Sequence, residues 1–226
     1  MKKMVKNQKT ITIGSFNLDI IPEIYVPGED TFLLEDVLRE VLKDSKKIIS
    51  VCYELGCGSG YLSLIIKSIL TNCFLFASDV NPNAIEVTKN NLKKNNLDLN
   101  TSVFVSDLFD SYNKIKIIND NKKIDLLIFN PPYIPGDSPI SREDVLENAL
   151  IGGGTTGDDI IIRFLKTLEF NKKDFFSKSG RLIILISSWN KKAKNWIETK
   201  NHFKIVNRIK KQISHETLFC YVLTIF

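Results

Sequence analysis

The stretch Glu54-Leu55-Gly56-Cys57-Gly58-Ser59-Gly60 decides the fold, because it stands between an apolar run (48–55) and a segment with helical spacing (61–70). Glycines allow a backbone to turn tightly and to approach a ligand closely. A dinucleotide-binding fingerprint would place its third glycine one residue later, and a phosphate-binding P-loop would need a Lys that is absent here. The pattern predicts a strand, a glycine-rich turn and a helix. A plain strand-to-helix turn without a ligand stays open as the alternative.

Outward from this turn, segments typical of strands alternate with segments typical of helices. We expect a helix that opens at Glu29, further helices at 61–70, 84–95, 160–168 and 191–199, and strands at 48–55, 73–80, 101–106, 126–129, 182–186, 203–209 and 218–226. This alternation indicates an α/β protein with a mostly parallel sheet. Only a turn around 211–214 joins the last two strands, so they should form an antiparallel hairpin. We expect residues 1–9 to be a frayed polar arm.

The composition is that of a soluble globular chain and excludes several classes of protein. The 226 residues fit one domain, and the net charge of +5 is well short of the basic stripe of a dedicated duplex-DNA binder. The four cysteines form no Cys-x-x-Cys pair and, with two histidines, give no zinc-ligand spacing, so we expect no metal site. Free cysteines indicate a reducing compartment. We expect a cytoplasmic protein, with the nucleus as a second location, and no membrane span.

Acidic residues end the two strands that follow the glycine turn. Asp79 ends the strand 73–80, where an acid can accept both hydroxyls of an adenosine ribose. Asp107 follows the strand 101–106 and could accept from an adenine amino group while Leu108 packs on the ring. With Glu54 these acids would form a rim at the carboxyl edge of the sheet, where ligands of such folds bind.

Together these motifs resemble the class I S-adenosylmethionine-dependent methyltransferases, which have a Rossmann-like seven-stranded sheet with a C-terminal antiparallel hairpin. The resemblance implies S-adenosyl-L-methionine as cofactor and S-adenosyl-L-homocysteine as product. This cofactor has no pyrophosphate, which agrees with the altered glycine spacing. The cofactor-binding residues that the resemblance implies are Thr31, Glu54, Gly56, Gly58, Gly60, Asp79, Val80, Asp107, Leu108 and Asn130. We expect one methyltransferase domain over 1–226, in which 1–45 covers the cofactor site and 46–226 forms the catalytic core.

The sequence Asn130-Pro131-Pro132-Tyr133, at the end of the strand 126–129, carries the expected chemistry. The Asn130 side-chain carbonyl and the Pro131 backbone carbonyl can accept hydrogen bonds from the two N–H groups of a planar nitrogen. Each proline keeps the residue before it extended, so the acceptors are held almost rigidly. Tyr133 can cover the planar face of the substrate. The motif resembles that of methyltransferases acting on glutamine amides, adenine N6 and guanine N2, and so indicates the atom better than the substrate.

Three further segments resemble the HemK-like family, in its short eukaryotic and archaeal branch. They are Tyr25-x-Pro27-x-Glu29-Asp30-Thr31, Gly153-Gly154-x-x-Gly157 and Glu216-Thr217-Leu218, and only about fifty residues precede the glycine turn. The resemblance implies N5-methylation of the glutamine in the Gly-Gly-Gln loop of a class 1 translation termination (release) factor. Cys57 and the Lys-rich segment 113–123, which we interpret as an inserted loop, depart from the family pattern.

The resemblance also implies a partner, a small zinc-binding activator protein that completes the sheet along Val103-Phe104-Val105. An exposed apolar edge strand favours such an addition; the alternative is that Phe104 packs inward. Three other functions stay open. They are adenine-N6 or guanine-N2 methylation of a nucleic acid, which would need base-recognition elements that do not fit here, protein lysine methylation, and a scaffold without activity. The intact Asp79, Asp107 and Asn130 argue against the scaffold.

Overall fold

The computed structural model describes residues 8–45, 49–112, 123–136, 146, 149–200 and 203–225. A seven-stranded sheet forms its centre, with the strand order β5-β4-β3-β6-β7-β9-β8. The strands are β3 (Val51–Leu55), β4 (Phe74–Asp79), β5 (Thr101–Val105), β6 (Ile124–Phe129), β7 (Phe176–Ser187), β8 (Phe203–Ile213) and β9 (Glu216–Ile225). The first five run parallel to one another, and β9 runs antiparallel to both β7 and β8. The α/β class and the closing hairpin predicted from the sequence are thereby confirmed.

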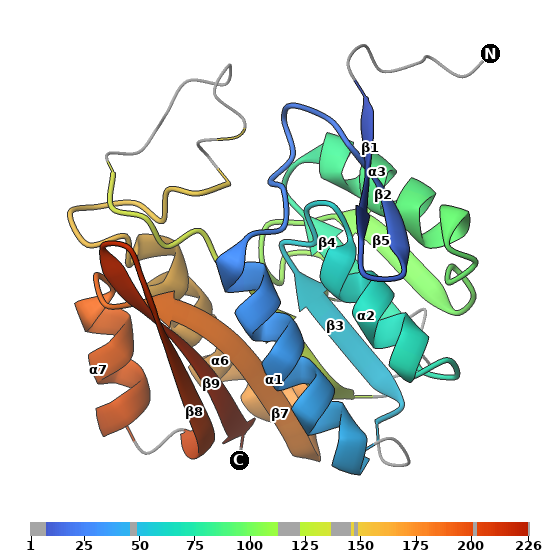
Figure 1. The fold of residues 1–226 in the computed structure, drawn as a ribbon. Coiled ribbons are helices and arrows are strands. Elements are labelled where there is room, and N and C mark those ends of the chain that lie inside the picture. Colours follow the sequence, from blue (N-terminus) through green and yellow to red (C-terminus); the bar gives the residue numbers. More distant parts are fainter. Residues whose placement is uncertain are drawn as a thin grey trace.

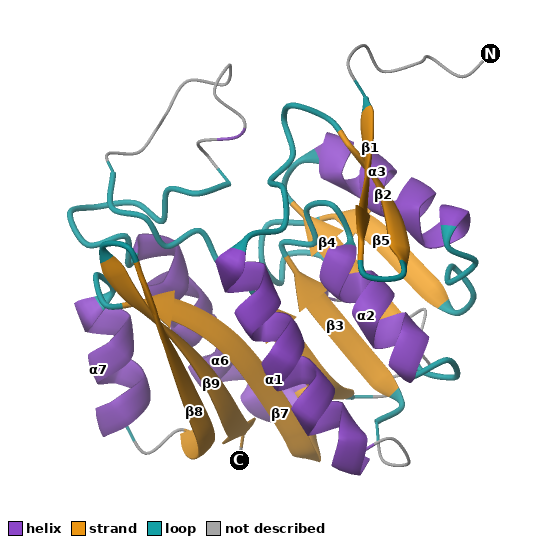
Figure 2. Ribbon diagram, viewed as in Figure 1, coloured by secondary structure: helices purple, strands orange, loops and turns teal. Residues whose placement is uncertain are grey.

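Helices cover both faces of the sheet (Figures 1 and 2). On one face α1 (Glu29–Ser45), α2 (Tyr61–Ile69) and α3 (Pro82–Lys94) pack side by side, and on the other α6 (Asp159–Phe175) packs with α7 (Lys191–Thr199). Central strands are therefore apolar on both sides, and all five residues of β3 are buried. None of the described helices has the length and apolar character needed to span a bilayer.

Local sequence explains how the two helices beside the glycine turn begin. Gly60 precedes α2 in a left-handed conformation, with φ of 77°, which glycine adopts without steric cost. Asn81 caps α3, since its side chain accepts a hydrogen bond from the Asn83 N–H, and Pro82 occupies the first turn. Both helices therefore begin at the carboxyl ends of β3 and β4.

The N-terminal segment differs from the expected polar arm. A β-hairpin of β1 (Lys9–Ile13) and β2 (Phe16–Ile20) forms there and packs on α3. The Asn91 amide of α3 binds the backbone of Asp19 on both sides, accepting from its N–H at 2.7 Å and donating to its carbonyl at 3.0 Å. The expectation of a frayed arm over 1–9 is wrong for Lys9, which pairs with Ile20, and residues 1–7 lie outside the described residues.

Strand boundaries also differ from those expected, most of all at the start of β7 and the end of β8. β7 begins at Phe176 instead of Leu182, and its pairing with β6 shifts in register between Phe176 and Arg181. β8 continues to Ile213, so the turn lies at 214–215 and the expected turn around 211–214 is displaced. Most of β8 is exposed, and its Lys- and Arg-rich outer part therefore lacks the apolar alternation of a strand with one buried face. The Lys-rich segment 113–123 lies outside the described residues except for Lys123.

Candidate active site

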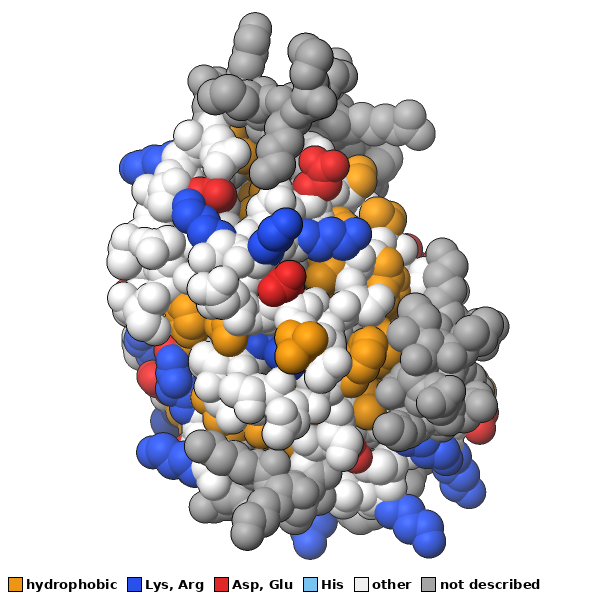
Figure 3. Space-filling view, turned by 90° about the vertical axis from the view of Figure 1, so that its right-hand side faces the viewer, with side chains coloured by type: hydrophobic (Ala, Val, Ile, Leu, Met, Phe, Trp, Pro, Cys, Tyr) orange, Lys and Arg blue, Asp and Glu red, His pale blue; other side chains and the backbone are white. Residues whose placement is uncertain are grey.

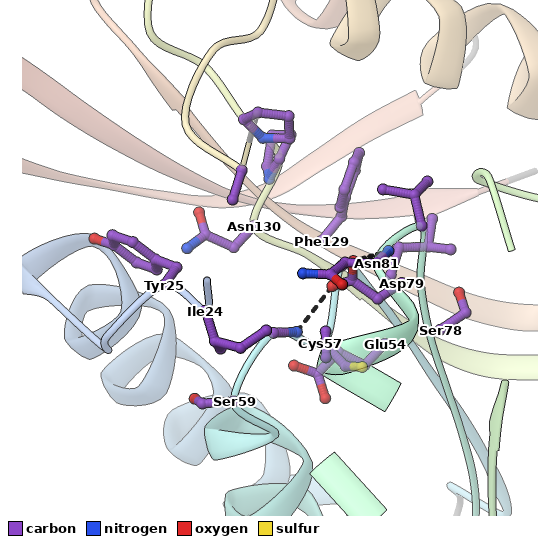
Figure 4. Close-up of a pocket in the computed structure, with 18 of the residues that line it drawn as sticks. Ile24, Tyr25, Glu54, Cys57, Ser59, Ser78, Asp79, Asn81, Phe129 and Asn130 are labelled. Atoms are coloured by element: carbon purple, nitrogen blue, oxygen red, sulfur yellow. Dashed lines mark hydrogen bonds between the residues drawn. The ribbon is translucent and has the colours of Figure 1, made fainter. Parts of the chain in front are cut away.

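A cavity of about 460 Å³ lies at the carboxyl ends of β3, β4, β5 and β6, a usual size for a small-molecule site. This is where the strand order reverses direction, between β3 and β6, and where ligands of such sheets bind. Figure 4 shows side chains from these strand ends and from the segment before α1 arranged around it. The lining includes these residues named from the sequence: Thr31, Glu54, Gly56, Gly58, Asp79, Val80, Asp107, Leu108, Asn130, Pro131, Pro132 and Tyr133.

The three glycines of the turn have different surroundings. Gly56 and Gly58 line the cavity with φ of 67° and 51°, and a Cβ on Gly58 would meet no atom within 4 Å. Gly60 is not among the lining residues, and a Cβ there would come within 2.9 Å of Thr88 on α3. Gly60 therefore allows α2 and α3 to pack closely, and its expected role in binding the cofactor stays a prediction.

Two acids, the buried Glu54 and the half-buried Asp79, hold the glycine turn in place. Asp79 accepts backbone N–H bonds from Gly58 at 3.0 Å and from Asn81 at 2.9 Å, so it ties the ends of β3 and β4 together. Burial raises the pKa of Asp79, although these backbone bonds oppose the rise. Glu54 accepts from the Ser63 hydroxyl of α2, and burial raises the pKa of this carboxyl to about 8. Glu54 is therefore mostly a neutral acid at pH 7 in the free protein.

The Asp107 carboxylate forms an ion pair with another residue of the cavity lining. Both guanidinium Nη atoms of Arg163, on α6, donate to its two carboxylate oxygens at 2.7 Å, in a bidentate pair. Arg163 also lines the cavity and was not identified from the sequence. Neither helical spacing nor a local motif could reveal the role of Arg163, because Arg163 and Asp107 are 56 residues apart in the sequence.

The structure holds Asn130, in the segment Asn130–Tyr133, in one orientation. The Asn130 Nδ2 donates to the Asp30 Oδ2 atom at 3.0 Å, whereas the Asn130 Oδ1 atom is enclosed and receives no hydrogen bond from any described residue. The ring of Tyr133 is nearly buried, and burial, followed by the nearby Asp30 and Glu216 carboxyls, raises its pKa well above the ordinary value. Tyr133 therefore stays a neutral phenol and an apolar wall.

A second glycine-containing segment, residues 152–157, lies next to the end of the Asn130–Tyr133 segment and is held there by hydrogen bonds. The Gly152 N–H donates to the Ile134 carbonyl at 3.0 Å, and the Asn190 Nδ2 donates to the carbonyls of Tyr133 at 2.9 Å and Gly157 at 3.2 Å. Asn190 precedes α7 and is fully buried. This role of Asn190 could not be predicted from the sequence, because a lone Asn before a helix indicates only a helix N-cap.

The sheet topology and the cavity at its switch point define a class I S-adenosylmethionine-dependent methyltransferase. The chain belongs to the methyltransferase small domain family, whose model matches residues 32–151, and its methyl donor is S-adenosyl-L-methionine. The fold is similar to that of the human methyltransferase 10 domain containing protein, with a TM-score of 0.64, 14% identity, and coverage of 92% of this chain and 88% of that one.

Curated relatives are similar over most of the chain. A putative protein N5-glutamine methyltransferase of Methanocaldococcus jannaschii is 34% identical over 79% of each chain. The eRF1 methyltransferase catalytic subunit mtq2 of Schizosaccharomyces pombe is 32% identical over 92% of each chain. The human methyltransferase HEMK2 is 31% identical over 63% of each. The resemblance to the HemK-like family is thereby confirmed.

Proposed function

We propose that this protein methylates the side-chain amide nitrogen of a glutamine in a protein, and that the target is the Gly-Gly-Gln loop of a class 1 translation termination factor. The observation that carries the proposal is the Asn130 side chain, which belongs to a residue of the cavity lining and whose enclosed Oδ1 atom receives no hydrogen bond from any described residue. A buried acceptor without a partner is rare in folded proteins and calls for an explanation. An N–H group of the substrate supplies the missing donor.

The chemistry of an amide explains why such an acceptor helps. The nitrogen lone pair of an amide is delocalised into its carbonyl, so the nitrogen is a poor nucleophile. Hydrogen bonds from its two N–H groups to the Asn130 side chain and the Pro131 carbonyl turn the lone pair out of conjugation and raise the electron density on nitrogen. S-Adenosylmethionine, when bound, supplies the methyl group and becomes S-adenosylhomocysteine, and the methylated nitrogen releases one of its two N–H protons to solvent. Positioning of this kind can contribute roughly 7–11 kcal/mol to lowering a barrier.

The other lining residues suit the cofactor. We assign Asp79 to the ribose hydroxyls, Asp107 and Leu108 to the adenine, and Thr31, Gly56 and Gly58 to the methionine end. Gly58 offers open space for a ligand at its Cα, and the Asp79 carboxylate, which is hydrogen-bonded to the Gly58 N–H, favours a sulfonium cation nearby. Val80, which is 63% exposed at the end of β4, would contact the outer face of the adenosine.

The names of the relatives support a protein amide as the substrate. The archaeal relative is described as a putative protein N5-glutamine methyltransferase, and the fission yeast relative as an eRF1 methyltransferase catalytic subunit. A Clostridium botulinum relative, of which the chain covers 45%, is described as a release factor glutamine methyltransferase. A target in translation termination implies that the protein acts in the cytoplasm.

The proposal is tested with methyl-labelled cofactor and an intact termination factor. We expect label on the wild-type factor and none on its Gln→Ala variant at the Gly-Gly-Gln loop. Equal labelling of both factors contradicts the proposal. Faster labelling of lysine or of adenine-containing nucleic acid would assign the site to another planar or amine nitrogen.

We also propose that a small zinc-binding activator protein pairs with β5. This strand ends the sheet, and no described strand pairs with its outer side. Exposed apolar side chains lie on this strand and just before it, since Val105 is 48% and Leu99 73% exposed; Figure 3 shows hydrophobic atoms at the surface of this face. Phe104 is only partly buried against Tyr53 and Phe76, so inward packing does not fully cover it.

Co-purification tests whether a small zinc protein binds this chain along β5. We expect a small zinc protein to co-purify with the wild-type chain and not with V105K, which places a charge on the edge strand. The matched control is F170K on α6, because Phe170 is 84% exposed and lies outside β5. Equal recovery of the partner by V105K and F170K would place the interface elsewhere.

A further inference from the structure

Asp30, the second residue of α1, lies where the N-terminal segment meets the catalytic loop. Its side chain is buried and accepts four hydrogen bonds. The Oδ1 atom accepts from the Tyr25 hydroxyl at 2.8 Å, the Thr31 N–H at 2.6 Å and the Thr31 hydroxyl at 3.2 Å. The Oδ2 atom accepts from the Asn130 Nδ2 at 3.0 Å. The Asp30 carboxylate therefore connects Thr31, a residue of the cavity wall, to the side-chain amide of Asn130.

The chemistry of a carboxylate dictates how Asn130 must turn. An ionised carboxylate only accepts hydrogen bonds, whereas the end of an asparagine carries one acceptor and one donor. The NH₂ group of Asn130 must therefore face Asp30, and its Oδ1 atom must point away from Asp30. Without this contact Asn130 could rotate its amide by half a turn at little steric cost, because the two ends have nearly the same shape.

We propose that Asp30 is a positioning residue that fixes the amide of Asn130 with its carbonyl oxygen toward the substrate nitrogen. The inference rests on the proposed function, since only a substrate with N–H donors needs an acceptor there. Asp30 keeps the Asn130 Oδ1 atom in an enclosed place where no described residue donates to it, an unfavourable state for the free protein that the substrate relieves. The same carboxylate binds the Thr31 N–H and hydroxyl, so the wall of the cofactor cavity and the acceptor are fixed together.

The isosteric change D30N gives a specific prediction. The backbone N–H of Thr31 can only donate, so the oxygen of the new amide must stay on that side. The NH₂ group of the new amide then faces Asn130, which turns its own oxygen toward position 30 and its NH₂ group toward the substrate. The group of Asn130 that faces the substrate thereby changes from a hydrogen-bond acceptor to a donor. We expect kcat to fall about 10- to 100-fold while the dissociation constant of the cofactor stays within about twofold.

A reciprocal exchange should restore activity. In the double variant D30N/N130D the new carboxylate at position 130 carries two acceptor oxygens, one for the amide NH₂ group at position 30 and one for the substrate. In N130D alone, two carboxylates would face each other at the 3.0 Å separation that now joins Asp30 and Asn130. We expect the double variant to be faster than either single variant. A merely structural role of Asp30 would make the two losses accumulate, so a double variant slower than both singles overturns the proposal.

An NMR measurement tests the orientation without any substrate. The Asn130 side-chain NH₂ signals, identified by their loss in N130A, should carry one proton shifted downfield by the bond to the carboxylate. D30N should remove that shift, and unchanged Asn130 signals in D30N would overturn the proposal. The control is D125N at the other end of β6, where Asp125 accepts from the backbone N–H groups of Ser50 and Val51 and should leave the Asn130 signals unmoved.

The proposed function and the role of Asp30 can be contradicted separately. If wild-type protein does not label a glutamine, the proposed function is wrong, while the NMR result still decides the orientation. If glutamine is labelled but D30N keeps wild-type kcat, the proposed function stands and the role of Asp30 is wrong.

Discussion

At the residue scale, Asn130 contributes one atom to the proposed chemistry, and its removal should separate turnover from binding. In N130A the cavity keeps the other residues assigned to the cofactor, whereas the substrate amide loses an acceptor. We expect the dissociation constant of S-adenosylmethionine, measured by calorimetry, to change little, and kcat to fall by about 100-fold or more, as for loss of a transition-state hydrogen-bond partner. A strong loss of cofactor affinity would show that Asn130 mainly holds the cofactor.

Asp79 should show the converse behaviour. Its carboxylate already accepts from two backbone N–H groups, so each oxygen keeps a free lone pair for a ribose hydroxyl. We expect D79A to weaken cofactor binding by about 1–3 kcal/mol, since a buried hydrogen-bond partner is lost. Calorimetric titration measures this loss, and kcat at saturating cofactor should fall much less. The control is D110A, because Asp110 is exposed and does not line the cavity.

At the element scale, the segment 151–157 serves as a backing for the catalytic loop. Gly157 has φ of 66°, and a Cβ there would lie 2.1 Å from the Tyr133 carbonyl oxygen. We therefore expect G157A to displace Tyr133 and to lower kcat at least tenfold. The matched control is G14A in the β1–β2 turn, where φ is 57° but no atom lies within 4 Å.

Comparison of these two variants separates steric displacement from backbone strain. Both alanines adopt the left-handed conformation, whose cost is roughly 1–2 kcal/mol. Thermal unfolding should therefore show some loss for both, whereas steady-state kinetics should show a loss of activity for G157A alone. Equal activity of the two variants would mean that the segment does not position Tyr133.

The elements that the sequence predicts well are those specified by neighbouring residues. β3 reads as a continuous apolar run, and Asn81-Pro82 marks the start of α3 within three residues. The β1–β2 hairpin was missed although Phe16, Leu18 and Ile20 alternate with polar residues after Gly14, which is a usable strand signal. β8 offered a weaker signal, because its pairing leaves most of its side chains exposed.

The residues of the candidate site fall into the same two groups, those that a local motif indicates and those that only the fold brings to their partners. Residues within the motifs, such as Asp79 and Asn130, could be named because the motif fixes their place at a strand end. Asp30, Arg163 and Asn190 act through partners that are 100, 56 and 57 residues distant in the sequence. No periodicity or spacing within a single sequence encodes such pairs, so their roles became visible only in the folded chain.

At the scale of the whole molecule, the cavity joins parts of the chain that the sheet order brings together. β3 and β6 are paired up to their last residues, Leu55 and Phe129, and just beyond them the start of α1 is joined to the end of β6 by the Asp30–Asn130 hydrogen bond. The beginning of β9 is near the same place, since the Glu216 carboxyl raises the pKa of Tyr133. Folding of the whole domain, more than any single element, therefore sets the geometry of the acceptor.

Stability of the whole protein should depend on pH through Glu54 beneath this cavity. Burial raises the pKa of this carboxyl from its ordinary 4.5 to about 8 in the folded state. Between these two values the folded state binds more protons than the unfolded state, so the free energy of unfolding must fall as pH rises. The contribution is fully present below about pH 4.5 and is lost as pH passes through about 8.

The variant E54Q removes this titration while an amide oxygen can still accept from Ser63. We expect the free energy of unfolding of E54Q, measured in urea at pH 5, 7 and 9 without cofactor, to vary less with pH than that of the wild type. The difference should favour the variant by a few kcal/mol at pH 9. The control is E40Q, because Glu40 is an exposed carboxylate of α1. Parallel pH profiles for E54Q and the wild type would mean that Glu54 is ionised in the folded protein, stabilised by surroundings other than the Ser63 hydroxyl.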